Sequence, residues 1–304
     1  MTDTIGIDVG GTKILAVRRR TDGTIVDEAR APSVYDREPL LAAIADLARS
    51  LGLDDVGAIG VGIAGMVTPA GTLRYGPNLP GIEEVDVRGE IASRLERPCV
   101  VDNDANVAGY AEVVQGAALG SQHALVVTLG TGIGGALIVD GKVYRGANGF
   151  AGEIGHWTVV RDGPVCACGE FGHWEAIASG NALARMARAA VESGSLAIEP
   201  DVDGPAVGRA AAAGDAGALA VLGAYADNVA LGLAGLATIL DPECVVISGG
   251  VVELGPSLFD PLRRSFLRHL EGDSHRPPIA LLPAALGERA GAIGAAALAT
   301  TIGA

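Results

Sequence analysis

The sequence predicts an α/β protein built from two halves of similar design. A unit of strand, glycine turn, strand, Asp-Gly turn and strand occurs twice, at residues 4–31 and 124–144. Each copy is followed by alternating helix and strand patterns, which are typical of βαβ units around a sheet. The chain has 304 residues, enough for two domains that share a cleft and have separate cores.

The first half begins with three strands joined by two turns. Asp-Gly between two apolar runs favours a tight hairpin, because both central residues of that turn take a positive φ. The strands are expected over residues 4–8, 13–20 and 25–31, with turns at 10–12 and 22–23. A helix over 39–51, a strand over 56–63, a helix over 88–95, a strand over 99–102 and a helix from Asn106 complete this half.

The second half repeats the opening unit and continues in the same manner. Its strands are expected over residues 124–129, 134–139 and 142–144, with turns at 130–132 and 140–141. Helices from Asn181 and Asp215, a strand over 244–248, a helix after Pro256, a strand over 279–282 and an alanine-rich closing helix follow. We interpret the repeat as an internal duplication with one phosphate-sized turn in each half.

Composition and charge exclude several classes of protein. Hydrophobic residues make up 49% and charged residues 19%, which indicates a globular chain. The formal net charge of −14 repels a phosphate backbone, so we expect no nucleic-acid partner. We see no signal-peptide pattern, and the apolar run at 229–240 is too short to span a bilayer, so we expect a cytoplasmic protein without membrane contact.

The second glycine turn, at residues 130–135, has the G-x-G-x-x-G spacing of a dinucleotide site. That site requires the turn to open a helix, whereas a β-hairpin follows here. The sequence also contains no G-x-x-x-x-G-K-[ST] motif. Two interpretations remain: a turn whose amides hold phosphate oxygens, or a structural hairpin without a ligand.

Three segments together resemble a known family. Residues 8–13 (DVGGTK) and 128–135 (TLGTGIGG) are similar to the two phosphate motifs of the ROK sugar kinases, in the actin–hexokinase superfamily, and 247–251 (ISGGV) to their adenosine motif. Bacterial glucokinases look most similar. The resemblance implies nucleotide contacts at Asp8, Gly10, Gly11, Thr12, Lys13, Thr131, Gly132, Gly249 and Gly250.

The resemblance also implies a two-domain actin-like ATPase fold, a duplicated ribonuclease H-like fold with a cleft between the domains. We expect a small N-terminal domain over residues 1–116 and a large domain over 117–287. The helix at about 288–304 is expected to pack back on the first domain.

Carboxylates follow the strand that ends near residue 102. The run Asp102-Asn103-Asp104-Ala105-Asn106 reads on its own as a strand end and a helix cap, with Asp104 as the cap. Phosphoryl transfer to a hydroxyl also needs a carboxylate to take the proton. The resemblance implies that Asp104 is this catalytic base, that Asn103 binds the sugar, and that Asp8 faces Mg²⁺ through its water shell.

Further sugar contacts are implied at four positions. Asn78 lies in a Gly-Pro-Asn-Leu-Pro loop, and Glu153 and His156 lie in Gly-Glu-Ile-Gly-His. Glu175 ends the segment at 166–175. Taken singly, Glu153 and Glu175 would be ordinary surface carboxylates. A pocket of such groups suits the hydroxyls of a hexose, because a missing hydroxyl leaves buried polar groups unpaired.

A cluster of cysteine and histidine predicts a metal site. A disulfide across one intervening residue is strained, so Cys166 and Cys168 are better metal ligands than a bridge. With His156 and His173 they form a tetrahedral Cys₂His₂ set for structural Zn²⁺. The family has a third cysteine where this chain has His173. The alternative is a metal-free loop held by packing around Trp174.

The resemblance implies an ATP-dependent hexose kinase that uses Mg²⁺, with glucose and ATP as the expected substrates and a homodimer or homotetramer as the assembly. N-acetylmannosamine, N-acetylglucosamine, fructose, and polyphosphate as donor remain open. A sugar-responsive regulator is the non-enzyme alternative, although no DNA-binding segment precedes the first strand. Loss of Cys168 is expected to raise the KM for sugar and to leave that for ATP unchanged.

Overall fold

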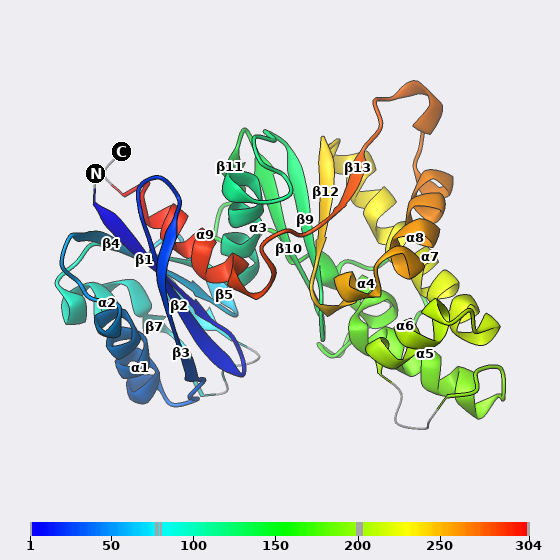
Figure 1. Ribbon diagram of the computed structural model, residues 1–304, viewed down its shortest axis with the longest axis horizontal. Helices are drawn as coiled ribbons and strands as arrows, with labels where there is room; N and C mark the ends of the chain where they lie inside the picture. Colours follow the sequence, from blue (N-terminus) through cyan, green and yellow to red (C-terminus); the bar gives the residue numbers. More distant parts are fainter. Residues whose placement is uncertain (1, 77–78, 80, 199–202, 303–304) are drawn as a thin grey trace. The chain divides into compact units, whose positions relative to one another are not determined.

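The computed structural model describes residues 2–76, 79, 81–198 and 203–302. The chain divides into two compact units (Figure 1). Unit 1 comprises Met1–Gln122, Ala136–Gly152 and Ala285–Ala304, and unit 2 comprises His123–Gly135 and Glu153–Ala284. Each unit is thus assembled from segments that are not contiguous in sequence. The domain limits inferred from the sequence, 1–116 and 117–287, remain a prediction.

A five-stranded sheet forms the centre of unit 1, with the strand order β3-β2-β1-β4-β8. β1 pairs antiparallel with β2 and β2 with β3, whereas β4 and β8 continue parallel to β1. The strands are β1 (Asp3–Val9), β2 (Lys13–Arg19), β3 (Ile25–Pro32), β4 (Val56–Ile63) and β8 (Cys99–Asn103). The carboxyl ends of β1, β4 and β8 therefore meet at one edge, where Asp8 and Asp102 lie.

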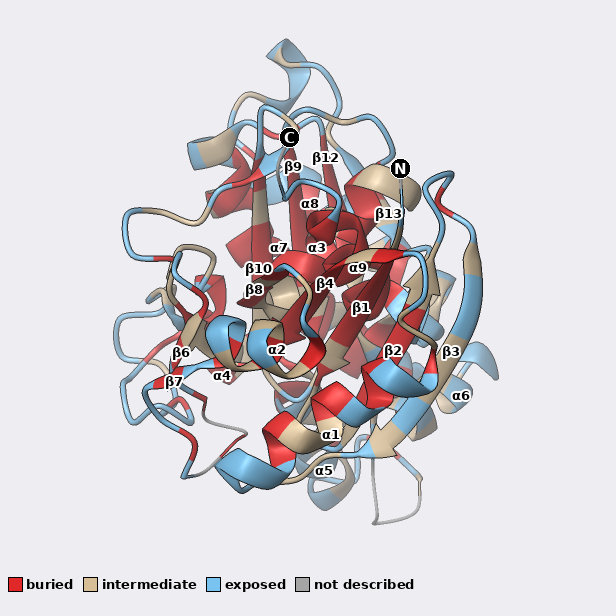
Figure 2. Ribbon diagram, turned by 90° about the vertical axis from the view of Figure 1, so that its left-hand side faces the viewer, coloured by how far each residue is buried: buried red, intermediate tan, exposed pale blue. Residues whose placement is uncertain are grey.

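Both faces of this sheet are covered by helices, as the buried strands in Figure 2 show. Successive residues of β2 point to opposite faces: Ile14 joins the core with α1 and α2, and Leu15 joins the core with α3 and α9. The helices are α1 (Arg37–Ser50), α2 (Val87–Leu95), α3 (Asp104–Gln115) and α9 (Ala290–Ala299). A small sheet of β5 (Met66–Val67), β6 (Thr72–Tyr75) and β7 (Val85–Asp86), which the sequence patterns missed, completes the unit.

Helix α9 lies unusually close to its neighbours because glycine stands at the contacts. A methyl group on Gly60 of β4 would lie 1.8 Å from the carbonyl oxygen of Ala295. A methyl group on Gly294 would lie 1.7 Å from the carbonyl oxygen of Val107 in α3. The alanine and glycine composition of α9 thus permits backbone contact with strand and helix at once.

The second sheet repeats the order of the first, as β11-β10-β9-β12-β13. Its strands are β9 (Ala124–Leu129), β10 (Ile133–Val139), β11 (Lys142–Val143), β12 (Cys244–Ser248) and β13 (Ala280–Pro283). β12 pairs parallel with both β9 and β13, as β4 does with β1 and β8. The strand order confirms the duplication inferred from the sequence.

The two Asp-Gly turns differ. Asp140 and Gly141 have φ of 52° and 69°, as the tight hairpin requires. At the first Asp-Gly turn Gly23 has a positive φ but Asp22 does not, so β2 and β3 form the predicted hairpin through another type of turn. The loop is wider: the amide of Arg20 donates to the carbonyl of Thr24, and the side chain of Asp22 accepts from the Thr24 amide at 2.8 Å.

The helices of unit 2 pack around the long helix α7. They are α4 (Trp174–Ala178), α5 (Gly180–Glu192), α6 (Gly204–Ala212), α7 (Ala216–Leu240) and α8 (Pro256–His269), with short 3₁₀ turns η1 (Ile154–His156), η2 (Gly250–Leu254) and η3 (Asp273–His275). The sequence patterns missed α4 and α6. Within the described residues, α7 is the one helix long and apolar enough to cross a membrane by length and composition, but 56% of its apolar window is buried inside the protein.

Candidate active site

Two carboxylates of unit 1 lie at the carboxyl edge of its sheet. The pairing register places Asp8 of β1 opposite Gly62 of β4, and Gly62 opposite Asp102 of β8. Gly62 carries no side chain, and a methyl group there would lie 3.7 Å from the Cα of Asp104. The row of strand ends therefore brings Asp8 near Asp104.

The start of α3 differs from the sequence-based prediction. The helix begins at Asp104, two residues before the predicted Asn106, because Asn103 caps it: its Oδ1 accepts from the amides of Ala105 and Asn106 at 2.8 and 3.1 Å. The interpretation of Asp104 as the cap was therefore wrong. The Asn103 Nδ2 donates to the carbonyl of Gly65 at 3.0 Å, so this side chain already holds two backbone segments.

A buried ion pair fixes the strand end beside Asp104. The carboxylate of Asp102 accepts from Arg145 Nε at 2.7 Å and from Asn106 Nδ2 at 2.9 Å. The Asp102 side chain keeps only 4% of its surface exposed, so its charge depends on Arg145 for compensation. Neither role of Asp102 or Arg145 was predicted from the sequence.

Burial changes the proton affinity of both active-site carboxyls. Burial, with the nearby charge of Asp104, raises the pKa of Asp8 to about 7, and Lys13 opposes this rise. Burial also raises the pKa of Asp104, while hydrogen bonds from Ala105, its own amide and Asn103 oppose the rise. Two neighbouring carboxylates of this kind suit a divalent cation, because its charge would favour their ionised forms.

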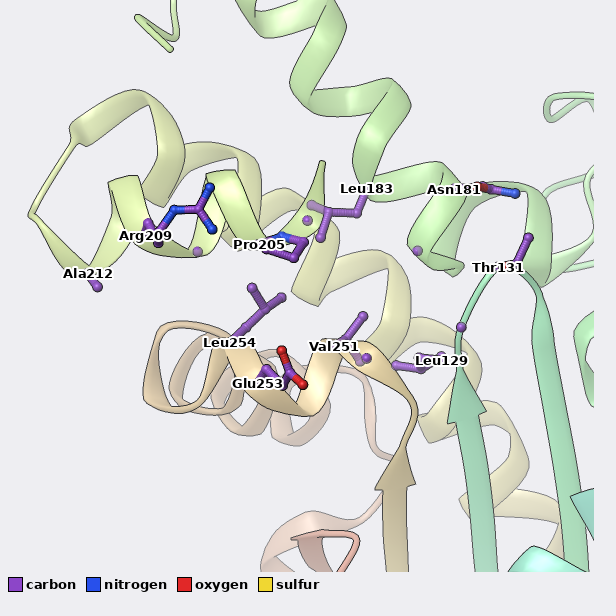
Figure 3. Close-up of a pocket in the computed structure, with 15 residues that line it drawn as sticks. Leu129, Thr131, Asn181, Leu183, Pro205, Arg209, Ala212, Val251, Glu253 and Leu254 are labelled. Atoms are coloured by element: carbon purple, nitrogen blue, oxygen red, sulfur yellow. The ribbon is translucent and has the colours of Figure 1, made fainter. Parts of the chain in front are cut away.

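The second glycine turn borders the described pocket of unit 2 (Figure 3). The pocket has a volume of about 580 Å³, and Thr131 of the turn and Gly250 of η2 both line it. Its other walls are mainly apolar and include Leu183 of α5, Pro205 of α6 and Leu254 of η2. The predicted phosphate and adenosine motifs thus meet at one concave, mostly apolar surface.

Polar side chains stand among these apolar walls. Arg209 of α6, Glu253 of η2 and Asn181 of α5 all line the pocket (Figure 3). Sequence reasoning found none of these residues, since they come from helices far apart in the chain.

The first glycine turn is held from the side of β3. The Ser33 hydroxyl donates to the carbonyl of Gly10 at 2.6 Å, and the Tyr35 hydroxyl donates to that of Gly11 at 2.7 Å. The turn closes where the amide of Gly10 donates to the carbonyl of Lys13 at 3.1 Å, and the Thr12 carbonyl accepts from the Ser33 amide. Ser33 and Tyr35 fix the turn without belonging to its motif.

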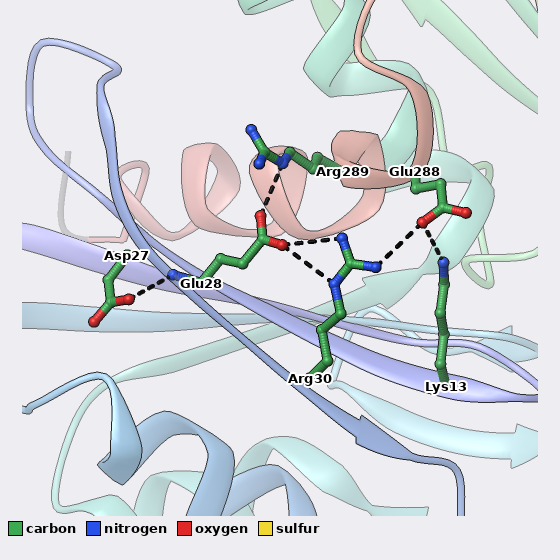
Figure 4. Close-up of polar contacts among 6 residues, drawn as sticks. All are labelled: Lys13, Asp27, Glu28, Arg30, Glu288 and Arg289. Atoms are coloured by element: carbon green, nitrogen blue, oxygen red, sulfur yellow. Dashed lines mark hydrogen bonds and ion pairs between the residues drawn. The ribbon is translucent and has the colours of Figure 1, made fainter.

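Lys13 joins an exposed ion-pair network (Figure 4). Its Nζ lies 2.7 Å from a carboxylate oxygen of Glu288, and Arg30 lies 3.5 Å from the same oxygen. Glu28 accepts from Arg30 and pairs with Arg289 at 2.8 Å. The pair with Lys13 lowers the pKa of Glu288. Exposed pairs of this kind contribute little to stability.

The predicted His/Cys cluster is brought together by unit 2. The ligand atoms of His156, Cys166, Cys168 and His173 all lie within 4.8 Å of one another. Cys168 Sγ is 3.2 Å from His173 Nδ1, and Cys166 Sγ is 3.7 Å from His156 Nδ1. Tetrahedral zinc with ordinary Zn–S and Zn–N bonds needs ligand separations of roughly 3.4–3.8 Å, so the donor set fits this ion after small shifts in which the 3.2 Å pair opens and wider pairs close.

Glu175 lies between this cluster and the second glycine turn. Its Oε2 accepts from the amide of Ile133 at 2.8 Å, and its Oε1 accepts from Cys166 Sγ at 3.6 Å. Glu153 is exposed at the start of η1, and Asn78 lies outside the described residues.

The glycines predicted to contact the nucleotide divide between the units. Gly10, Gly11 and Thr12 form the turn of unit 1, whereas Gly132 and Gly249 adjoin the pocket of unit 2. A methyl group on Gly249 would lie 2.3 Å from the carbonyl oxygen of Leu129, so this position requires glycine for close approach to β9.

The whole chain was compared with known protein families and proteins. Residues 4–302 match the ROK family. The glucokinase of Streptomyces coelicolor is 36% identical over an alignment of 308 positions, which covers 97% of each protein.

Two crystal structures are similar along their whole length. A ROK family glucokinase from Streptomyces griseus, in complex with glucose and AMPPNP, has a TM-score of 0.85 and 37% identity, covering 98% of this chain and 99% of that one. A ROK hexokinase from Thermus thermophilus has a TM-score of 0.81 and 35% identity, covering 98% of both chains. The similarity confirms the predicted two-domain actin-like ATPase fold.

Proposed function

Because this chain belongs to the ROK family, we propose that it is an ATP-dependent glucokinase, which converts glucose and ATP to glucose 6-phosphate and ADP. It is thus a phosphotransferase with an alcohol group as acceptor. The observation that carries the proposal is the partly buried carboxylate pair of Asp8 and Asp104, whose pKa values are both raised. A carboxylate whose pKa is raised by burial, as that of Asp104 is, is a stronger base for a hydroxyl proton than an exposed one.

The proposed chemistry is an in-line displacement. Asp104 accepts the proton of the sugar hydroxyl, and the hydroxyl oxygen forms a bond to the γ-phosphorus of ATP. The bond from that phosphorus to the β,γ-bridging oxygen breaks, and ADP leaves with the electron pair. Burial is the larger effect on Asp104 and strengthens it as a base, while Ala105 and Asn103 favour its ionised form and limit the rise of its pKa.

Nucleotide binding is assigned to both glycine turns. The pocket lined by Leu183, Pro205 and Leu254 suits the flat purine, and Thr131 and Gly132 lie beside it for the phosphates. Lys13 offers a compact positive charge to phosphate oxygens. Asp8 is the group placed to hold Mg²⁺ through water, and that ion would neutralise charge on the phosphate oxygens.

The sugar is assigned to Asn78, Asn103, Glu153, His156 and Glu175, with Zn²⁺ in the neighbouring cluster as a structural ion. Burial raises the pKa of the Cys166 thiol to about 11, so this sulfur requires a bound cation to ionise at neutral pH. We further expect a cytoplasmic homodimer or homotetramer that binds neither nucleic acid nor membrane.

A coupled assay of ADP release across a sugar panel tests the proposal. Glucose should give the highest kcat/KM, ahead of N-acetylmannosamine, N-acetylglucosamine and fructose, and ATP should outperform inorganic polyphosphate as donor. If no sugar of the panel is phosphorylated, the assignment to the kinases is contradicted and a sugar-responsive regulator is favoured.

A further inference from the structure

The backbone of one residue next to the second glycine turn, Ile133, is held from two sides. The N–H of Ile133, the residue that follows Gly132, donates to Glu175 Oε2 at 2.8 Å. On the other side the backbone of η1 packs directly against the Ile133 carbonyl. A methyl group on Gly155 would lie 2.5 Å from that oxygen.

The two contacts come from the two chain segments that carry the histidines of the His/Cys cluster. Gly155 immediately precedes His156, and Glu175 follows His173 by two residues. The segment that carries His173 and Glu175 is anchored in the core. Trp174 is fully buried, and its Nε1 donates to the carbonyl of Asn228 in α7 at 3.0 Å.

The start of the turn is held by the same segment. The amide of Gly180, at the start of α5, donates to the carbonyl of Gly130 at 2.7 Å. No side chain fits between the turn and Glu175, because a methyl group on Gly132 would lie 2.2 Å from Glu175 Oε2. The turn is therefore bonded to the 175–180 segment at both of its ends.

We propose that the cluster of His156, Cys166, Cys168 and His173 positions the nucleotide-phosphate turn at 130–132, acting through Glu175 and Gly155. This inference rests on the proposed kinase function and extends it: zinc in the cluster sets the affinity for the phosphates of ATP as well as the site of the sugar. It replaces the expectation from sequence that loss of Cys168 leaves the KM for ATP unchanged. That expectation treated distance along the chain as distance in space.

The proposal separates the parts of the nucleotide. A nucleoside occupies the apolar pocket between α5, α6 and η2, whereas the phosphates require the amides of the turn. Loosening the turn should weaken binding of a triphosphate and leave adenosine unaffected.

The test compares Cys168→Ser with Glu170→Gln. Cys168 is exposed and touches neither Glu175 nor Ile133 in the described contacts, and Glu170 is an exposed residue of the same loop outside the ligand set. Zinc content is measured together with calorimetric Kd values for adenosine and for a non-hydrolysable ATP analogue, without sugar. Cys168→Ser should lose zinc and weaken the analogue by about 10–100-fold, the usual range for supporting residues, with adenosine unchanged. Glu170→Gln should match the wild type throughout.

Hydrogen exchange gives a readout that does not depend on activity. The Ile133 amide should exchange faster in Cys168→Ser and in Glu175→Ala, and the double variant should resemble the stronger single variant, because both changes act through one contact.

Three results would overturn the proposal: a wild type that binds no zinc, a zinc-free variant with unchanged analogue affinity and Ile133 protection, or equal losses for adenosine and analogue. Failure of the kinase assignment is distinct, since it appears as wild-type protein that phosphorylates no sugar while Ile133 exchange still reports the contact.

Discussion

In the proposed mechanism Asp104 is the base that takes the proton of the sugar hydroxyl. Asp104→Asn keeps the size of the side chain and much of its hydrogen bonding but cannot accept a proton. We expect kcat to fall by about 10²–10⁴-fold with a much smaller change in sugar affinity. The assay is steady-state kinetics with glucose, together with a sugar Kd. Asp54→Asn, at an exposed position of the same unit, should leave kcat unchanged. Near wild-type turnover in Asp104→Asn would assign the base elsewhere.

Asp8 should reduce stability as the pH rises. Its folded pKa of about 7 lies above the ordinary value of 3.8, so the folded state keeps this proton between those values while the unfolded state loses it. The contribution of Asp8 to stability is complete below pH 3.8 and is lost as the pH rises through 7, by about 4 kcal/mol. Asp8→Asn has no such charge.

The stability of Asp8→Asn relative to wild type should therefore grow from pH 4.5 to pH 8 in magnesium-free buffer, while kinase activity is lost. Denaturant unfolding at both pH values measures the difference, and Asp273→Asn, at an exposed position, provides the control. A difference that does not vary with pH would show that Asp8 ionises freely in the folded protein.

At the level of elements, the close contact of α9 with its neighbours makes a sharp stability prediction. Gly294→Ala places a methyl group 1.7 Å from a backbone oxygen of α3, which only backbone displacement can relieve. We expect a loss of about 3 kcal/mol or more in the free energy of unfolding.

The matched control is Gly223→Ala in α7, where a methyl group meets no atom within 4 Å. This change should stabilise by about 0.5–1 kcal/mol, because alanine has the higher helix propensity. Equal effects of the two substitutions in thermal unfolding would mean that α9 does not pack as closely as described.

Elements with strong local patterns were predictable. β4, with eight mostly apolar residues between turns, was placed correctly at both ends, as was β12. The start of α3 was misplaced because Asn103 and Asp104 are both good caps. The hydrogen bond from Asn103 Nδ2 to the Gly65 carbonyl, which selects Asn103 as the cap, depends on the fold. α4 and α6 were missed because five- and nine-residue helices carry little periodicity.

The residues of the candidate site likewise fall into those that a local motif predicts and those that only the fold brings together. Residues within contiguous motifs, such as those of the glycine turns and the His/Cys segment, could be named from the sequence. The walls of the pocket come from α5, α6 and η2, and no local pattern connects Leu183 with Leu254. The contact from Glu175 to Ile133 joins residues 42 positions apart, so it required the fold.

For the whole molecule, unit 1 depends on the segment after residue 284. Glu112, buried in α3, accepts from the amides of Ala285 and Leu286 at 3.0–3.1 Å and from Ala117 at 2.7 Å. The α9 residues that follow cover one face of the sheet. Deleting residues 285–304 should therefore abolish amide protection in β1 and β4 while β9 and β12 remain protected, as hydrogen exchange with mass spectrometry can measure. Protection of β1 in the shortened protein would show that unit 1 completes its core without α9.

The place of α9 in the chain sets the order in which a ribosome can deliver a finished protein. β1 emerges first, yet its covering helix is translated only after every residue of unit 2. Unit 2 can therefore fold on the nascent chain while the apolar residues on one face of β1 and β2 are not yet covered by α9. Until α9 has emerged, that face is open to chaperones and to neighbouring nascent chains, and slow synthesis would prolong the exposure. Yield in cells should accordingly respond more to chaperone supply than the stability of the finished fold would suggest.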